Sequence, residues 1–214
     1  MPLRKEKIEV GSFYHVFNKT IEGFVIFNNN FDYHRMLSCL SFYNILDQKY
    51  KLSYYFGRGK EDFFDKIKEY EKIVEIYAYC LMPTHVHLLL REIREGGISF
   101  FMNKISKSYA QYFNKKYKRQ GPLWQGRYKN VLVKEDEQLI YLTRYIYRNP
   151  CKSGLVDSPQ EWKYSSLQEV LNDKYGVVEP LSSISDMSLP AYIEFLADNP
   201  VPVPDGNWVG ESNE

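Results

Sequence analysis

Two of the four histidines of the chain, His85 and His87, stand one residue apart in a run of strand-forming residues. Side chains alternate between the two faces of a β-strand, so both imidazoles project from one face while Val86 projects from the other. Two neighbouring imidazoles form half of a ligand set for a divalent metal ion. Histidine is also common in protein cores and on surfaces, so this spacing alone leaves a purely structural role open.

A second candidate pair, Tyr145 and Asn149, lies near the end of a predicted helix. Residues four apart share one helical face, so these two are neighbours and Tyr147 points elsewhere. A tyrosine hydroxyl can act as a nucleophile that forms a covalent intermediate, and an amide oxygen can bind a metal ion. The alternative is an amphipathic helix that buries its aromatic rings and ends in a polar cap.

The segment from Gly96 to Lys134 contains no aspartate or glutamate, and its basic residues alternate with aromatic rings. Cations neutralise DNA phosphates, and exposed rings stack on bases with about 1–3 kcal/mol each. A solvated helix face would be expected to carry acids as well, so the pattern favours nucleic-acid binding. The candidate nucleic-acid-binding residues are Lys104, Lys107, Lys115, Lys116, Lys118, Arg119, Trp124, Arg127 and Lys129.

Charge is distributed unevenly along the 214 residues, although the formal net charge is only +1. Residues 155–214 hold eleven acidic and two basic side chains, so the rest of the chain carries an excess of ten positive charges. A basic body followed by an acidic tail suggests a polyanionic partner, and an uneven solvated surface is the alternative. The hydrophobic fraction of 44% is that of an ordinary globular protein.

The composition gives no sign of a membrane or an oxidising compartment. No apolar run approaches the roughly 20 residues needed to span a bilayer, and the first residues are charged and lack the apolar stretch of a signal peptide. The three cysteines, Cys39, Cys80 and Cys151, show no CxxC spacing and are expected to be reduced thiols. We therefore expect a cytoplasmic protein with no membrane partner.

The periodicity of apolar residues outlines the elements that must position these groups. Strands are predicted at residues 14–18 and 131–133, and residues 73–81 and 85–90 are predicted to form either two adjacent strands or one strand bent at Pro83. Helices are predicted at residues 32–46, with Asp32 as the candidate cap, at 98–117 and at 135–149, the last ended by Asn149-Pro150. A further helix is predicted before Tyr70, short helices at 165–171 and 189–197, and an extended proline-rich stretch at 199–204. The mixed order of strands and helices, without a glycine-rich phosphate loop, predicts an α+β fold with a mainly antiparallel sheet.

Four segments, in this order along the chain, resemble the single-tyrosine HUH transposases and in particular the REP-associated tyrosine transposases. They are LMPTHVHLL at residues 81–89, YFN at 112–114, GPLWQGRYK at 121–129 and YIYRNP at 145–150. YHV at residues 14–16 and WKYSS at 162–166 are similar as well, so the resemblance covers roughly residues 10–170. Each segment alone is weak evidence, and the combination is specific.

The resemblance implies a role for each candidate residue. His85 and His87 match the pair that holds Mg²⁺ or Mn²⁺, Asn149 matches the third ligand, and Tyr145 matches the nucleophile. Thr84 departs from the asparagine or glutamate that relatives commonly place before the pair. The implied fold is a ferredoxin-like α+β sandwich with a central, mainly antiparallel sheet and helices on its face.

The implied activity is that of a transposase that cuts and rejoins hairpin-containing single-stranded DNA through a covalent 5′-phosphotyrosine. Residues 1–155 would form the transposase domain and residues 156–214 an acidic C-terminal extension, in a monomer or a homodimer. One alternative is a non-catalytic DNA-hairpin-binding protein, which would keep the basic segment and need no metal. Another is a metal-dependent phosphohydrolase that uses water, although two-metal hydrolysis usually needs more carboxylate ligands.

Overall fold

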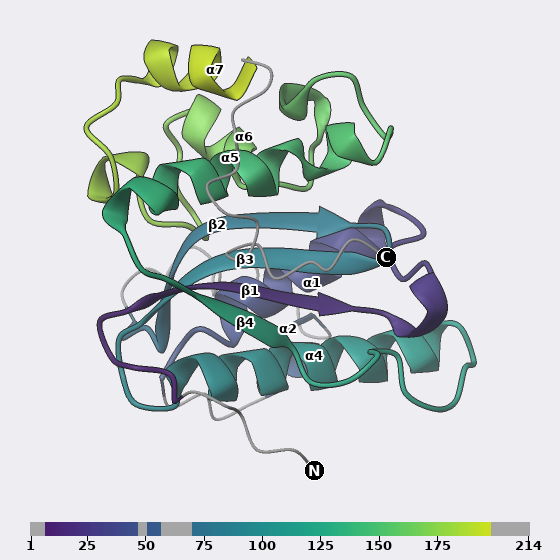
Figure 1. Ribbon diagram of the computed structural model, residues 1–214. Helices are drawn as coiled ribbons and strands as arrows, with labels where there is room; N and C mark the ends of the chain where they lie inside the picture. Colours follow the sequence, from purple (N-terminus) through teal and green to yellow (C-terminus); the bar gives the residue numbers. More distant parts are fainter. Residues whose placement is uncertain (1–6, 47–50, 57–69, 198–214) are drawn as a thin grey trace.

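A four-stranded antiparallel sheet lies at the centre of the computed structural model, which describes residues 7–46, 51–56 and 70–197 (Figure 1). Its strand order is β2-β3-β1-β4, so the strand with the paired histidines is central. The strands are β1 (Phe13–Lys19), β2 (Val74–Met82), β3 (His85–Glu92) and β4 (Lys129–Val133). The predicted antiparallel sheet is therefore confirmed, and β2 and β3 are two strands joined through Pro83 and Thr84.

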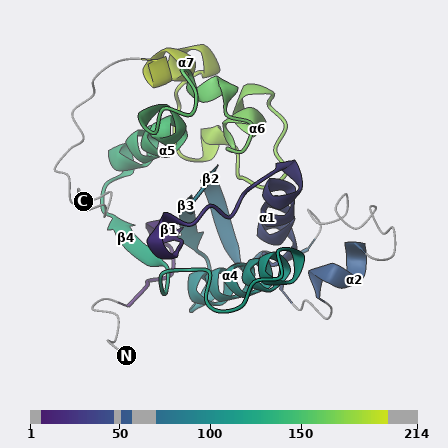
Figure 2. The same cartoon turned by 90° about the vertical axis from the view of Figure 1, so that its right-hand side faces the viewer.

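Helices cover both faces of the sheet (Figures 1 and 2). One layer contains α1 (Asn30–Phe42) and α4 (Gly97–Lys116), with the short α2 (Leu52–Phe56) beside them. The other layer contains α5 (Asp136–Lys152), α6 (Leu167–Leu171) and α7 (Leu189–Ala197). Short 3₁₀ turns occupy Ile21–Gly23, Pro159–Glu161 and Leu181–Ser183. The ferredoxin-like α+β prediction is confirmed, and the α5 layer adds a second helical cover.

Alternation along β3 separates two hydrophobic cores. Val86, Leu88 and Leu90 pack in the cluster beneath α1 and α4, whereas Leu89 packs in the cluster beneath α5. His87 shares the α5 side because side chains two residues apart along a strand share a face. The catalytic candidates therefore lie in the layer between β3 and α5.

A β-bulge in β2 adapts this strand to both cores. The pairing with β3 shifts between Ile76 and Ala78, so Tyr77 is the extra residue. After the bulge, Cys80 faces the α5 core and lies opposite His87 across the sheet. Apolar side chains of β2 therefore lie beside the histidine pair on this side of the site.

Asp32 was expected to cap α1, but Asn29 is the N-cap and its side chain accepts a hydrogen bond from the Asp32 backbone N–H. The Asp32 carboxylate is fully buried in the first turn of α1. It pairs with Lys116 at 2.7 Å and accepts hydrogen bonds from the hydroxyls of Tyr112 at 2.9 Å and Tyr117 at 2.6 Å. This cluster fastens the start of α1 to the end of α4.

Replacing Asp32 by asparagine is expected to lower the free energy of unfolding by about 3 kcal/mol at neutral pH, because the buried carboxylate accepts charge-assisted hydrogen bonds from Lys116, Tyr112 and Tyr117 that a neutral amide cannot replace. Burial would raise the pKa of Asp32, but hydrogen bonds from Lys116, Tyr117 and Tyr112 outweigh it and lower the pKa overall. The carboxylate therefore stabilises the fold above its unfolded pKa of about 3.9, and this contribution is lost as pH falls through the lower folded value.

Urea unfolding across pH measures this effect. The difference between the native protein and the Asp32→Asn variant should be large at neutral pH and shrink in acid. A difference that stays constant from neutral pH into acid would contradict the role of the Asp32 charge.

Helix α5 runs past the predicted stop at Asn149-Pro150 and ends at Lys152. Proline removes one backbone donor and disturbs the preceding turn, but here it lies only two residues before the helix end. Asn149 and Pro150 are both buried, so tertiary packing holds this turn helical. The Ser153 N–H donates to the Asn149 carbonyl, and the Leu155 N–H donates to the Pro150 carbonyl.

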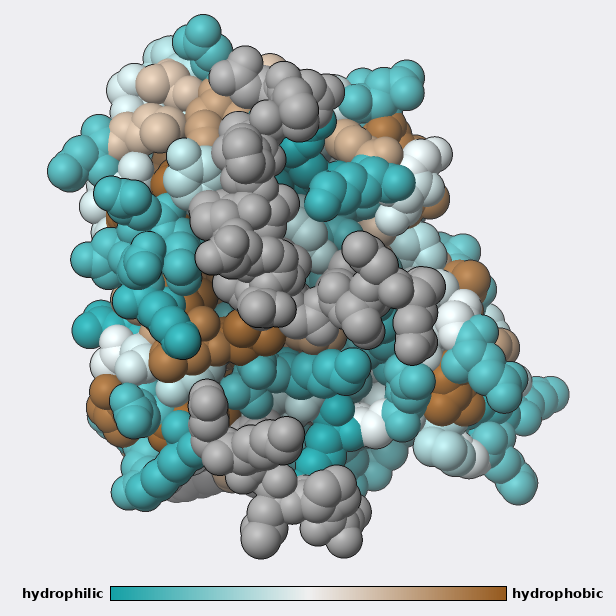
Figure 3. All heavy atoms as spheres, viewed as in Figure 1, coloured by the Kyte–Doolittle hydropathy of each residue, from teal (hydrophilic) through white to brown (hydrophobic). Residues whose placement is uncertain are grey.

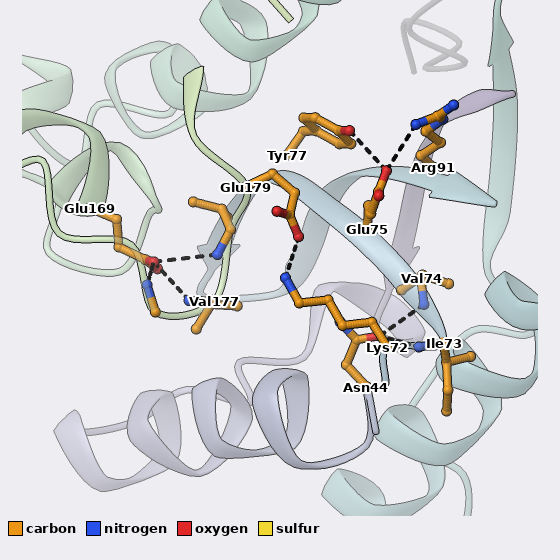
Figure 4. A network of polar contacts seen from close by, with 12 residues as sticks. Asn44, Lys72, Ile73, Val74, Glu75, Tyr77, Arg91, Glu169, Val177 and Glu179 are labelled. Atoms are coloured by element: carbon orange, nitrogen blue, oxygen red, sulfur yellow. Dashed lines mark hydrogen bonds and ion pairs between the residues drawn. The ribbon is translucent and has the colours of Figure 1, made fainter. Parts of the chain in front are cut away.

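The C-terminal extension packs on the sheet as far as α7. Its side chains Leu167 and Tyr192 belong to the same core as the α5 residues. Figure 4 shows how the extension covers the edge of β2: the Glu179 carboxylate pairs with Lys72, and the Glu169 carboxylate accepts from the Val177 N–H. The Glu179 backbone N–H also donates to the carbonyl of residue 76 at 2.7 Å.

Two predicted elements, the helix before Tyr70 and the extended stretch at 199–204, lie outside the described residues. In the described part of the chain, no helix combines the length and apolar character that crossing a bilayer requires. On the face drawn in Figure 3, the coloured residues are largely hydrophilic, and hydrophobic side chains gather in separate patches.

Candidate active site

The paired histidines stand at the start of β3, with their rings close together. His85 is half-buried and His87 is fully buried. The ring centroids are 4.9 Å apart and the ring planes are nearly perpendicular, at 86°. Both imidazoles therefore share one small region on the α5 side of the sheet, as their spacing predicted.

Each ring is held on its Nδ1 side by a neighbouring residue. The Nδ1 of His87 lies 3.0 Å from Nε2 of the buried His15 on β1. The Nδ1 of His85 lies 3.0 Å from the Thr84 hydroxyl oxygen. Such second contacts orient ligand histidines and select their tautomer. A metal ion would consequently be bound through the Nε2 side of both rings.

The pKa of His87 is lowered well below its usual value, first by burial and then by the neighbouring groups His15, His85, Lys19 and Lys152. His87 is therefore a neutral imidazole near neutral pH. The neutral ring has a lone pair to donate, which is the form that binds metal ions.

Helix α5 brings Tyr145 against the histidines. Its ring lies edge-on to His87, with centroids 6.0 Å apart, and edge-on to His15, with centroids 5.8 Å apart. Tyr145 is only 8% exposed. Tyr147, as predicted, points elsewhere and hydrogen-bonds the Ser166 hydroxyl at 2.9 Å. The first tyrosine of the motif is thus the one that lies beside the histidine pair.

Asn149 is buried one turn beyond Tyr145, on the same face of α5. Its side-chain amide nitrogen donates to the Tyr145 carbonyl oxygen at 3.2 Å. This bond uses the nitrogen of the amide, and the amide oxygen is the atom that could serve as a metal ligand.

Two exposed lysines, Lys19 and Lys152, add positive charge around the buried groups. The Lys152 ammonium lies 4.5 Å from the centroid of the Tyr145 ring. Lys19 pairs with His85 across β1 and β3 and projects from the same face. The surroundings of the histidine pair are therefore suited to a negatively charged ligand such as a phosphate.

The predicted nucleic-acid-binding residues are divided between two layers of the molecule. Lys129 on β4 and His87 on β3 both lie directly opposite Phe17 of β1, so all three side chains share one face. Lys104 and Lys107 are exposed on α4, which covers the opposite face. The structure brings Lys129 to the histidine side and leaves the α4 lysines on the other side.

Several members of this set also have structural partners. Lys116 pairs with Asp32, and the Trp124 indole N–H donates to the Ser106 carbonyl at 3.0 Å. Arg119 donates to the Asn114 side-chain oxygen at 3.3 Å. The exposed cations of the predicted set are Lys104, Lys107, Lys115, Lys116, Lys118, Arg127 and Lys129.

The donor set fits a divalent ion with a mixed preference for nitrogen and oxygen. No three His, Cys, Asp or Glu side chains converge as a metal cluster within the described ranges, so the predicted set depends on the Asn149 amide. Two imidazoles and one amide oxygen suit Mn²⁺, and Mg²⁺ where phosphate and water supply further oxygens.

Sequence reasoning did not assign roles to His15, Lys19 and Lys152. His15 lies 72 residues before its hydrogen-bond partner His87, so local spacing cannot reveal the contact. The available signal was strand alternation, because a histidine on the strand beside β3 can face the same side. Lys152 lies seven residues after Tyr145, which is two helical turns along one face.

Comparisons with known proteins agree with the motifs and the fold. A curated relative from Haemophilus influenzae, whose provisional name is REP-associated tyrosine transposase, is 34% identical over 105 residues. The match covers 43% of this chain and 58% of that protein, so it spans less than two thirds of the relative. A solved REP-associated tyrosine transposase, bound to a REP hairpin, has a TM-score of 0.57 and 16% identity over 88% of this chain and 96% of that chain.

The solved structure shows that the fold is shared. Residues 29–149 match the family described as Transposase IS200 like. This match includes the paired histidines, the basic segment, Tyr145 and Asn149, and it covers more than half of the chain. The chain therefore belongs to the family of IS200-like transposases.

Proposed function

We propose that this chain is a metal-dependent single-strand DNA endonuclease and strand transferase that forms a covalent 5′-phosphotyrosine at Tyr145. His85, His87 and Asn149 would hold Mg²⁺ or Mn²⁺. The proposed substrate is single-stranded DNA that contains a hairpin, because the similar solved transposase is bound to a REP hairpin. The observation that carries the proposal is the edge-on contact of the Tyr145 ring with His87, at 6.0 Å between centroids.

The proposed reaction exchanges one phosphodiester for another. The Tyr145 hydroxyl oxygen attacks the scissile phosphorus and loses its proton, while the bond from phosphorus to the 3′ oxygen breaks. The 3′ oxygen takes up a proton and leaves as a hydroxyl, and the 5′ phosphate remains on the tyrosine. Attack by a 3′-hydroxyl on this linkage reverses the step and rejoins a strand without a nucleotide cofactor.

The surrounding groups have distinct tasks in this scheme. A bound divalent ion would polarise the scissile phosphate and stabilise its developing charge. Lys19 and Lys152 would add electrostatic stabilisation of that charge from preorganised positions. The buried His15 would hold the ring of His87 in the orientation in which its Nε2 atom faces the metal ion.

A hairpin oligonucleotide labelled at its 3′ end tests the proposal. With Mn²⁺, the label should migrate with the protein on a denaturing gel, and a chelator should prevent this. Trypsin cuts after Arg144 and Arg148, so the DNA-bearing peptide should be the four residues 145–148. Fragmentation of this peptide in a mass spectrometer should place the nucleotide on the first tyrosine.

The same experiment separates the two alternatives. A hairpin-binding protein without activity would bind the labelled DNA in chelator and release no fragment. A phosphohydrolase that uses water would turn over repeatedly and leave no label on the protein. Either result would overturn the proposed covalent mechanism.

Replacing His15 by phenylalanine is expected to weaken Mn²⁺ binding about 10- to 100-fold, the usual range when a partner of a ligand histidine is lost. The aromatic ring keeps the packing against Tyr145 and loses the hydrogen bond to His87. His15→Gln can place an amide near the lost nitrogen and should retain most of the affinity. Titration of the full chain with Mn²⁺, followed by electron paramagnetic resonance, measures both variants. If the His15→Phe variant binds Mn²⁺ as tightly as the native protein does, His15 does not orient His87 for metal binding.

A further inference from the structure

An aromatic pocket lies at the end of the sheet where β3 begins, between the end of α4 and the loop that follows β1. It has a volume of about 550 Å³, within the range of roughly 300–1,000 Å³ usual for small-ligand sites. Its lining residues are Phe24, Asn28, Phe113, Tyr117, Lys118 and Arg119.

In this pocket the exposed ring of Phe24 packs on the buried ring of Phe113. Phe24 is 42% exposed and packs edge-on against the buried Phe113, with centroids 5.8 Å apart. The Phe113 ring in turn lies 4.5 Å from that of Tyr117, whose hydroxyl is fixed by Asp32 at 2.6 Å. The packed rings of Phe113 and Tyr117 thus hold the Phe24 ring in a fixed, partly exposed position. A side chain that is already ordered loses less conformational entropy when a ligand binds.

The charges around the pocket are positive. The Arg119 guanidinium lies over the Phe24 ring at 5.2 Å, and Lys118 is an exposed cation of the lining. The lining contains no carboxylate. Aromatic faces flanked by cations are the usual surface for unpaired nucleotides, whose bases stack while their phosphates are neutralised.

Backbone hydrogen bonds tie the pocket to the histidine strand. The Thr20 N–H donates to the Thr84 carbonyl at 2.9 Å, and the Ile26 N–H donates to the Pro83 carbonyl at 2.9 Å. The loop that carries Phe24 is therefore joined to the turn directly before His85. A DNA strand with a phosphate at the histidine pair would therefore lie near the end of the sheet that carries this loop, because His85 is the first residue of β3.

We propose that this pocket binds an unpaired nucleobase of the single-stranded segment beside the hairpin, with the base stacked on Phe24. This inference rests on the proposed function, and it specifies which part of the DNA is recognised. A base inside a duplex is stacked on both sides and cannot offer its face to the ring. The pocket would therefore distinguish a hairpin with a single-stranded flank from a blunt hairpin.

The test uses a REP hairpin oligonucleotide, the kind of DNA bound by the similar solved transposase, made with single-stranded flanks or blunt. Binding is measured by fluorescence anisotropy with the full chain carrying Tyr145→Phe, which prevents cleavage. Adding Phe24→Ala should weaken binding of the flanked hairpin about tenfold and leave the blunt hairpin unchanged. Val25→Ala is the matched control, because Val25 is adjacent and 43% exposed, and it should leave both affinities unchanged.

Abasic substitution along the flank then locates the base. At one position, loss of the base should cost the parent protein about tenfold and cost the Phe24→Ala variant nothing further. If Phe24→Ala weakens both hairpins equally, or neither, or if every abasic position behaves alike in the two proteins, the pocket assignment is wrong. Cleavage by the native protein in the same preparation distinguishes this failure from failure of the proposed function.

Discussion

Replacing Tyr145 by phenylalanine is expected to abolish the protein–DNA adduct, with a loss of at least about a thousandfold in the rate of strand cleavage. The substitution removes only the hydroxyl oxygen that would form the bond to phosphorus. The ring can keep its edge-on contacts with His15 and His87. Single-turnover cleavage of labelled hairpin DNA measures the loss, and unchanged hairpin affinity would show that the site is otherwise intact.

Tyr147→Phe is the matched control for this experiment. Tyr147 lies two residues away and is buried, and its hydroxyl bonds to Ser166 at 2.9 Å. Its loss should cost about 1 kcal/mol of folding free energy and leave the adduct in place. An adduct that persists in the Tyr145→Phe variant and disappears in the Tyr147→Phe variant would show that Tyr147, and not Tyr145, is the nucleophile.

Replacing His85 by alanine is expected to remove most metal-dependent cleavage, again by about a thousandfold. A metal ion at a phosphate contributes several kcal/mol to the transition state, and each 1.36 kcal/mol corresponds to a tenfold change in rate. His85 is only half-buried, so its removal disturbs the fold less than removal of the fully buried His87. The Mn²⁺ affinity should fall together with the rate.

His34→Ala supplies the comparison for this prediction, because His34 is an exposed histidine on α1. It should bind Mn²⁺ and cleave DNA like the native protein. If His85→Ala cleaves at the native rate in Mn²⁺, the metal site does not include this residue. If the rate falls while Mn²⁺ affinity stays constant, His85 acts on the DNA and not on the ion.

Local patterns were sufficient to predict the central elements of the fold. The run of strand-forming residues at 85–90 predicted the strand, and the period of two along a strand then placed His85 and His87 on one face. The apolar spacing of residues 98–117 predicted α4 to within a residue at each end. The pairing of Tyr145 with Asn149 followed from helical geometry alone.

Contacts between distant segments could not be predicted in this way. The hydrogen bond from His15 to His87 depends on strand order, which no local spacing encodes. The basic segment looked like one surface, but the chain turns after α4, so Lys129 emerges on the opposite face from Lys104. The stop predicted at Pro150 was wrong because packing of a buried helical turn outweighed the local preference of proline.

That proline has a mechanical consequence for the nucleophile. In a regular helix the N–H of residue 150 would bond to the carbonyl of residue 146, and Pro150 has no N–H to give. The missing hydrogen bond would close the turn of residues 146–150, which contains Asn149 and directly follows Tyr145. This turn is more compliant than the rest of α5, so small rearrangements of the phenol and the amide can occur together without unwinding the helix.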